Sequence, residues 1–115
     1  MNHLMVIRLW VTGLVPSKVK EYDEFANSRS LSMFKSLDGC LGVIFLRSGE
    51  RGYVVSFWWD MASIDALKTS ALYKATVADI SVAGFLSEPQ TVEILDATGG
   101  FLSPDVLKAI SELEI

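Results

Sequence analysis

Few residues of this sequence have side chains that could carry chemistry, and they lie far apart in the chain. Arg8 interrupts the apolar run LMVIRLWVT at residues 4–12. Because a buried guanidinium needs an anionic partner or several acceptors, Arg8 could bind a ligand's carboxylate or phenolate, or pair with a strand carboxylate such as Glu93. Tyr73 could donate a proton to a ligand, and Asp79 is the nearest candidate for an acid or base. Their structural alternatives are a packed ring with a hydrated hydroxyl and a solvated carboxylate on a helix surface.

Three tryptophans and one cysteine are the other candidates. Trp10, Trp58 and Trp59 could form a stacking wall for an aromatic ligand, although large aromatic residues in strands also fill cores and interfaces. We predict ligand contacts for Trp10 and Trp58, together with Tyr73. Cys40 is interpreted as a small turn residue, because no cationic neighbour in the sequence would activate its thiol.

The scarcity of histidine and cysteine excludes several kinds of site. The sequence has one cysteine, so no intrachain disulfide is possible. His3 is its only histidine, which argues against a zinc or iron site with nitrogen and sulfur ligands and against Ser-His-Asp or Cys-His nucleophiles. No GxGxxG motif follows a predicted strand, so neither a flavin nor a nicotinamide site is indicated. We therefore predict no metal and no cofactor.

Composition limits the partners of the chain. Its 10 Lys and Arg residues against 14 Asp and Glu give a net charge of −4, which argues against nucleic acid because that binding requires a basic surface. No stretch reaches the roughly 18 apolar residues of a membrane span, and the first apolar run lacks the features of a secretory leader. A cytoplasmic protein without nucleic-acid or membrane partners is expected. Hydrophobic residues make up 50% of the chain, so part of this surface is expected in a subunit interface or a ligand cavity.

Periodicity and turn residues predict elements in the order β-α-β-β-α-β. The strand segments are rich in β-branched, aromatic and aliphatic residues, and the helical segments repeat apolar residues at helical spacing. Strands are expected at residues 4–12, 42–47, 53–59 and 91–96, one helix from an N-cap at Ser17 to about Leu37, and two further helical stretches after Asp60 and at about 71–82. This order is that of a ferredoxin-like α+β domain with one antiparallel sheet.

The end of the chain departs from this plan. Residues 1–97 are predicted to form the ferredoxin-like domain and residues 98–115 a tail. The tail begins with the flexible Thr98-Gly99-Gly100, and Ser103-Pro104-Asp105 has the N-cap, proline and acidic residue typical of a helix start. We expect an extra, short amphipathic C-terminal helix that docks on its own domain or on a partner.

The predicted strands are apolar on both faces, unlike strands of a sheet with one wet face. In the first strand, Met5, Ile7, Leu9 and Val11 share one face, while Val6 and Trp10 share the other with Arg8 and Thr12. The two helical regions can cover one face only, and each large apolar side chain left bare forgoes roughly 1.5–3 kcal/mol of burial. We therefore expect a homodimer through the open sheet face. A monomer covered by its own C-terminal helix is the alternative.

A series of short motifs resembles the antibiotic biosynthesis monooxygenase (ABM) family over about residues 4–96. The motifs are Arg8-Leu9-Trp10, Gly13 to Pro16, Gly39 to Gly42, Ser56-Phe57-Trp58, and Phe85 to Pro89 leading into Val92-Glu93. The resemblance implies a dimeric α+β barrel of two ferredoxin-like sheets packed face to face, with a pocket between the sheet and helices of each subunit. Family members include cofactor-free monooxygenases of polyketide aromatics and haem-degrading enzymes.

Carried over residue by residue, the resemblance implies a site with few polar groups. Trp58 matches a tryptophan that recurs in the family before the second helix. Val54 and Ile64 stand where the quinone-forming members have an asparagine and a tyrosine. Leu67 and Val77 stand where the haem-degrading members have a tryptophan and the iron-ligating histidine, so haem ligation by that route is excluded.

The resulting expectation is a protein that binds a small, largely apolar or aromatic molecule and could oxidise it without a cofactor. In that chemistry the deprotonated substrate itself reduces dioxygen, and the protein supplies a dry pocket, a base and charge stabilisation. Arg8 with Tyr73 or Asp79 would fill those roles. A non-catalytic binding or interaction module and an isomerase or lyase on the same fold are the alternatives. Whether a cavity on the order of a few hundred Å³ exists beside Trp58 is the observation that bears most on these alternatives, because a pocket filled by side chains favours a structural module.

Overall fold

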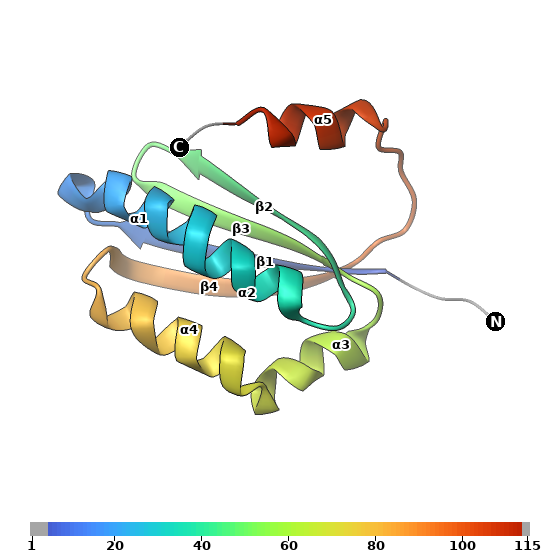
Figure 1. Ribbon diagram of the computed structural model, residues 1–115, viewed down its shortest axis with the longest axis horizontal. Helices are drawn as coiled ribbons and strands as arrows, with labels where there is room; N and C mark the ends of the chain where they lie inside the picture. Colours follow the sequence, from blue (N-terminus) through green and yellow to red (C-terminus); the bar gives the residue numbers. More distant parts are fainter. Residues whose placement is uncertain (1–4, 114–115) are drawn as a thin grey trace.

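A four-stranded antiparallel sheet, in the order β2-β3-β1-β4, organises the chain (Figure 1). The computed structural model describes residues 5–113. Its strands are β1 (Val6–Leu14), β2 (Cys40–Ser48), β3 (Arg51–Trp58) and β4 (Leu86–Asp96). Its helical segments are η1 (Pro16–Lys18), α1 (Val19–Phe25), η2 (Ala26–Ser30), α2 (Leu31–Ser36), α3 (Met61–Asp65), η3 (Ala66–Thr69), α4 (Ala71–Val82) and α5 (Asp105–Ser111). The predicted ferredoxin-like α+β fold is confirmed.

The predicted first helix forms one helical stretch from η1 to α2, with the π-helical segment η2 in its middle. The N-cap expected at Ser17 is wrong, because Ser17 lies inside η1 and Pro16 begins that turn. Proline suits this place because its missing N–H would have no helical acceptor there. The stretch ends at Leu37, whose extended backbone leads through Gly39, with a φ of +79°, into β2.

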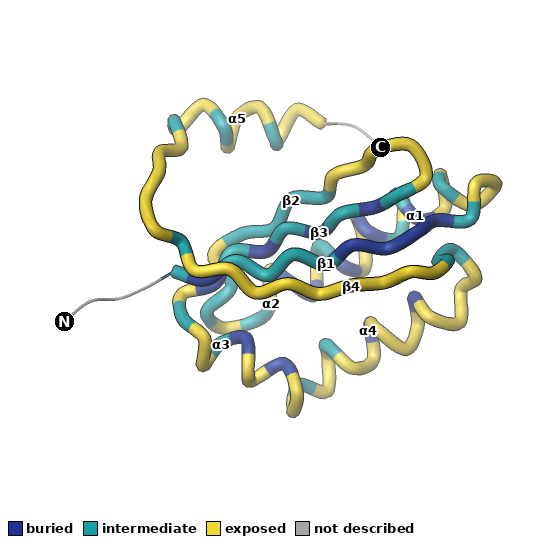
Figure 2. The backbone as a smooth tube through the Cα atoms, turned by 180° about the vertical axis from the view of Figure 1, so that it is seen from behind, coloured by how far each residue is buried: buried dark blue, intermediate teal, exposed yellow. Residues whose placement is uncertain are grey.

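Strand register assigns alternate residues to two faces of the sheet. Arg8 lies opposite Ser56 and Trp10 opposite Val54 in the pairing of β1 with β3, and these residues face the helices. The opposite face carries an apolar set: Ile7, Leu9 and Val11 from β1, Ile44 and Leu46 from β2, Val55 and Phe57 from β3, and Leu95 from β4. Figure 2 views the molecule from this side, where the four strands lie in front of the helices. We call this side the open sheet face.

Two apolar clusters fill the space between the sheet and the helices, one around Trp58 and the other around Leu14 and Tyr22. Trp58 is fully buried. Its indole N–H donates to Ser56 Oγ at 2.8 Å, and its ring meets Phe34 edge to face with the ring centres 6.4 Å apart. Trp58 is therefore a satisfied core residue.

Strand β4 begins at Leu86, earlier than the sequence pattern predicts. Pro89 obscures this part of the strand, because proline lacks a ladder donor and is confined to edges and bulges. β4 is an edge strand, and its pairing with β1 shifts register between Thr12 and Gly13. A Cβ at Gly13 would lie 2.5 Å from Ser87 Oγ, so the close approach of β4 at this bulge requires glycine.

The C-terminal helix α5 lies beyond strand β2, apart from the other helices (Figures 1 and 2). An apolar groove of about 560 Å³ separates α5 from the sheet. Leu102, Val106 and Leu107 line it on the tail side, and Ile44 and Phe57 on the sheet side. The helix therefore stands beside the sheet and leaves most of the open sheet face uncovered. Within residues 5–113, no helix combines the length and the apolar character that crossing a membrane requires.

Candidate ligand-binding site

A cavity of about 130 Å³ lies between the helix-facing side of the sheet and the helices η2, α2 and α4. The strands contribute Arg8, Trp10, Val54, Leu86 and Gln90 to its lining, and the helices contribute Ser30, Met33, Phe34, Tyr73, Thr76, Val77, Ile80 and Ser81. The volume of the cavity is below a few hundred Å³, and Trp58 does not line it. The space beside Trp58 is filled by side chains, because that indole is packed into the core.

The cavity brings together Arg8 and Tyr73, which are 65 residues apart in the chain. Arg8 Nη2 donates to the Tyr73 hydroxyl at 3.0 Å, and the guanidinium carbon lies 5.8 Å from the centre of the Tyr73 ring. Tyr73 belongs to the first turn of α4, where its backbone N–H donates to Oγ of the N-cap Ser70 at 3.1 Å. The register of β1 and the cap of α4 thus place the two polar groups beside each other.

The Arg8 guanidinium has no carboxylate partner among residues 5–113. The suggested pairing with Glu93 is wrong, because Glu93 lies opposite Leu9 in the ladder between β1 and β4 and so points to the other face of the sheet. Among these residues, the half-buried guanidinium donates a side-chain hydrogen bond only to the Tyr73 hydroxyl. Such a cation in an apolar wall favours an anionic oxygen from elsewhere.

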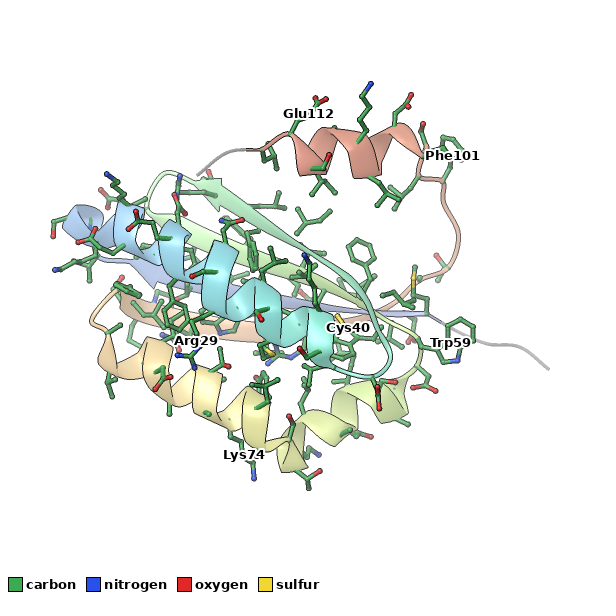
Figure 3. The ribbon with its side chains drawn as sticks, viewed as in Figure 1. Arg29, Cys40, Trp59, Lys74, Phe101 and Glu112 are labelled. Carbon is green, nitrogen blue, oxygen red and sulfur yellow. The ribbon has the colours of Figure 1, made fainter. Side chains whose placement is uncertain are left out.

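The three tryptophans do not form one wall. Trp10 lines the cavity, and Trp58 lies in the core. Trp59 follows the end of β3 and is 53% exposed, with its ring directed away from the sheet (Figure 3). Of the three tryptophans only Trp10 lines the cavity, and the other aromatic rings of the lining are Phe34 and Tyr73.

Asp79 lies outside the lining of the cavity. Its Oδ2 is 2.5 Å from Arg29 Nη2, and both side chains are about half exposed, at 49% and 48%. Arg29 also lies over the ring of Phe25, 5.7 Å from its centre, and Figure 3 shows it between the first helical stretch and α4. The structure therefore places Asp79 with Arg29 and does not bring it to Arg8 and Tyr73.

Four polar residues of the lining were not predicted from the sequence: Ser30, Thr76, Ser81 and Gln90. Gln90 precedes the predicted fourth strand, so no face could be assigned to it. Small hydroxyl residues on helices carry no distinctive signal, and the Thr76 hydroxyl already donates to the Leu72 carbonyl at 2.9 Å. Ser81 and Gln90 are exposed, so they lie toward the solvent side of the cavity.

Cys40 lies at the start of β2, outside this cavity. Burial raises the pKa of its thiol, which disfavours the reactive thiolate. In the described part of the chain, no three His, Cys, Asp or Glu side chains gather into a group that could hold a metal ion.

Aliphatic side chains occupy the positions at which the ABM resemblance would place an asparagine, a tyrosine, a tryptophan or a histidine. Val54 and Val77 line the cavity, and Ile64 and Leu67 are buried in the core cluster around Trp58. The polar chemistry of the cavity therefore comes from other positions, chiefly Arg8 and Tyr73.

Solved structures with the same fold come from several organisms. A "putative antibiotic biosynthesis monooxygenase" from Caulobacter crescentus CB15 is similar with a TM-score of 0.71 and 18% identity, over 84% of this chain and 92% of that one. A protein of the same description from Nitrosomonas europaea has a TM-score of 0.71 and 14% identity, over 85% and 94% of the two chains. A conserved protein from Methanosarcina mazei Go1 has a TM-score of 0.68 and 19% identity, over 79% and 90%.

This chain shares their fold. The ABM resemblance is thereby confirmed at the level of the fold. The matched region covers more than nine-tenths of the two chains of that description. By sequence, neither a family model nor a curated protein matches the chain.

Proposed function

We propose that this protein binds a small, largely apolar or aromatic molecule carrying one anionic oxygen group, in the cavity between the sheet and α4. The observation that carries the proposal is the half-buried Arg8 guanidinium, which lines an apolar cavity without a carboxylate partner among residues 5–113. Burying a cation in this way costs free energy unless an anion compensates it. A bound carboxylate or phenolate would supply that compensation.

The two polar side chains suit an anionic oxygen. The Tyr73 hydroxyl accepts from Arg8, so its own proton is available for a second acceptor. Arg8 has five N–H donors, of which one points to Tyr73. Together they would present charge-assisted donors from two directions, and Trp10 and Phe34 would contact the apolar part of the ligand.

The size of the cavity favours one ring. Its volume of about 130 Å³ is close to the ~150 Å³ of an engineered apolar cavity that accepts benzene. A molecule with several fused rings would exceed this volume and would extend out through the solvent side of the cavity. The proposed ligand is therefore monocyclic.

Calorimetric titration with benzoate tests the proposal. Charge-assisted hydrogen bonds contribute about 1.5–3 kcal/mol, so Arg8→Met is expected to weaken benzoate binding about 10- to 100-fold. Arg29→Met is the matched control, because it removes an arginine that lies outside the lining, and it should change the affinity less than twofold. Absence of benzoate binding, or equal effects of the two substitutions, would contradict the proposal.

Cofactor-free monooxygenation is a second candidate, favoured by the names of the structurally similar proteins. A monocyclic quinol would supply all four electrons for the reduction of dioxygen. One oxygen atom would form a bond to a ring carbon, the quinol would become a hydroxyquinone, and the second oxygen atom would leave as water with two hydrogens of the quinol. Arg8 would stabilise the ionised substrate. Among residues 5–113 the lining includes no carboxylate or imidazole, so a readily ionised substrate suits it best.

Oxygen uptake separates catalysis from binding alone. Catalysis predicts one dioxygen consumed for each hydroxyquinone formed, at a rate that Arg8→Met lowers. Binding of the quinol without oxygen uptake above the protein-free rate would identify a non-catalytic binding module.

We further propose that two copies associate through the open sheet face. The exposed apolar side chains of this face include Leu46, which is 50% exposed, and Leu95, which is 41% exposed. A two-fold related copy would cover one such sheet with the other. The helix-facing cavity would then remain accessible, because it lies on the opposite side of the sheet.

A further inference from the structure

The cavity is elongated, because its lining residues extend along α4 from Tyr73 to Ser81 and across the sheet from Arg8 on β1 to Gln90 on β4. Arg8 and Tyr73 are in contact at one end. Gln90 lies opposite Thr12, four residues further along β1, which is a distance of roughly 13 Å. Ser81 lies eight residues after Tyr73 on α4, or roughly 12 Å. Both measures place Gln90 and Ser81 at the other end of the cavity.

The two ends differ in charge and exposure. The Arg8 end is cationic and half-buried, whereas the Gln90 end is neutral and exposed. A glutamine amide can both donate and accept hydrogen bonds, and a serine hydroxyl can do the same. The wall between the ends is largely apolar, with Trp10, Val77 and Ile80.

We propose that the ligand is a para-substituted single-ring aromatic compound, with an anionic oxygen group at Arg8 and a neutral hydrogen-bonding group, such as an amide or hydroxyl, at Gln90. This inference rests on the proposed function and narrows its ligand class. Substituents in para positions extend from opposite ends of a ring, as the two polar ends of the cavity require. The volume of about 130 Å³ leaves room for one ring between those ends.

Three related probes test the proposed ligand class by calorimetric titration: benzoate, 4-carbamoylbenzoate and 3-carbamoylbenzoate. A hydrogen bond between neutral groups changes affinity about three- to tenfold. We expect the para amide to bind about fivefold more tightly than benzoate and the meta isomer to gain nothing, because its amide would be directed into the apolar wall.

Two variants locate the amide contact. Gln90→Leu should lower the ratio of the para amide's affinity to that of benzoate from about five to about one. Ser81→Ala should also reduce this ratio. The substitution lies on the exposed surface of α4 and favours helix, so it provides the test if Gln90→Leu does not fold. Thr91→Val is the control, because Thr91 is adjacent in the chain but faces the other side of the sheet.

The outcomes distinguish this inference from the proposed function. If benzoate binds through Arg8 but the para amide gives no advantage, the bifunctional ligand is wrong while the anion site stands. An advantage that survives both Gln90→Leu and Ser81→Ala, or that the meta isomer shares, would also overturn the inference. If benzoate does not bind or does not depend on Arg8, the proposed function itself fails.

Discussion

Tyr22 shows how burial of a single side chain links folding to pH. Tyr22 belongs to α1 and is 3% exposed in the apolar cluster with Leu14, and its pKa is raised from 10.0 to about 12. Loss of hydration on burial is the largest cause, the carboxylate of Asp23 adds to it, and the cation of Arg47 acts in the opposite direction. The folded chain therefore retains the phenol proton in a pH range where the unfolded chain releases it.

The raised pKa of Tyr22 predicts a loss of stability at alkaline pH. Its contribution is fully present below pH 10, the pKa in the unfolded chain, and is lost as the pH rises toward 12. A shift of this size corresponds to about 3 kcal/mol of unfolding free energy. Urea unfolding at a series of pH values should show this decline in the natural chain and a smaller decline in Tyr22→Phe.

Phenolate absorbance provides the check on the residue itself. The difference between the natural chain and Tyr22→Phe should develop near pH 12, provided the chain is still folded there. A difference that develops near pH 10 in folded protein would contradict the burial of this phenol.

At the scale of elements, Gly39 controls the passage from the first helical stretch into β2. Its φ is +79°, and a Cβ at this position would collide with Ser63 Oγ. Ser63 cannot easily withdraw, because its hydroxyl donates to Asp60 Oδ1 at 2.8 Å in the cap of α3. The turn thus packs directly against the start of the next helix.

Gly39→Ala is expected to lower the unfolding free energy by about 2 kcal/mol or more, because left-handed strain and a steric clash act together. Gly49→Ala is the matched control: its φ is +58°, but nothing lies within 4 Å of the added Cβ. That substitution should cost about 1 kcal/mol from backbone strain alone. Equal losses in urea unfolding would show that the contact with Ser63 does not matter.

The elements themselves could largely be predicted from local patterns. Helical spacing and the turn at Gly39 bounded the first helical stretch, and glycine-flanked apolar runs indicated the hairpin of β2 and β3. The start of β4 could not be predicted, since a proline in a strand is tolerated only at an edge. Edge position depends on strand order, which is a property of the whole sheet.

At the scale of the whole molecule, the open sheet face leads to a prediction about assembly. The substitution Val55→Glu, in the centre of that face, should convert a dimer into a monomer at low micromolar concentration. The new carboxylate would be buried without a cation, on a face that already carries Glu93 opposite Leu9. Light scattering measures the change. Ala75→Glu, on the exposed surface of α4, alters the net charge equally and should leave the mass unchanged.

A natural chain that is well folded and monomeric at that concentration would refute the proposed association. If the Val55→Glu variant still has the mass of a dimer, another surface must hold the two copies together. The tail would then be the next region to consider, since Phe101 is 85% and Leu107 74% exposed, and Figure 3 shows Phe101 at the turn before α5.

The amino-acid sequence alone determined the order of the elements and the apolar character of both sheet faces, because both follow from periodicities of two and 3.6 residues along the chain. It also identified Arg8 as a cation that needs a partner. Only the tertiary structure decided which partner, since Arg8 meets Tyr73 across 65 residues and Glu93 lies on the other face. A register change of one residue reverses the face of every side chain in a strand, and register is set by contacts between distant segments.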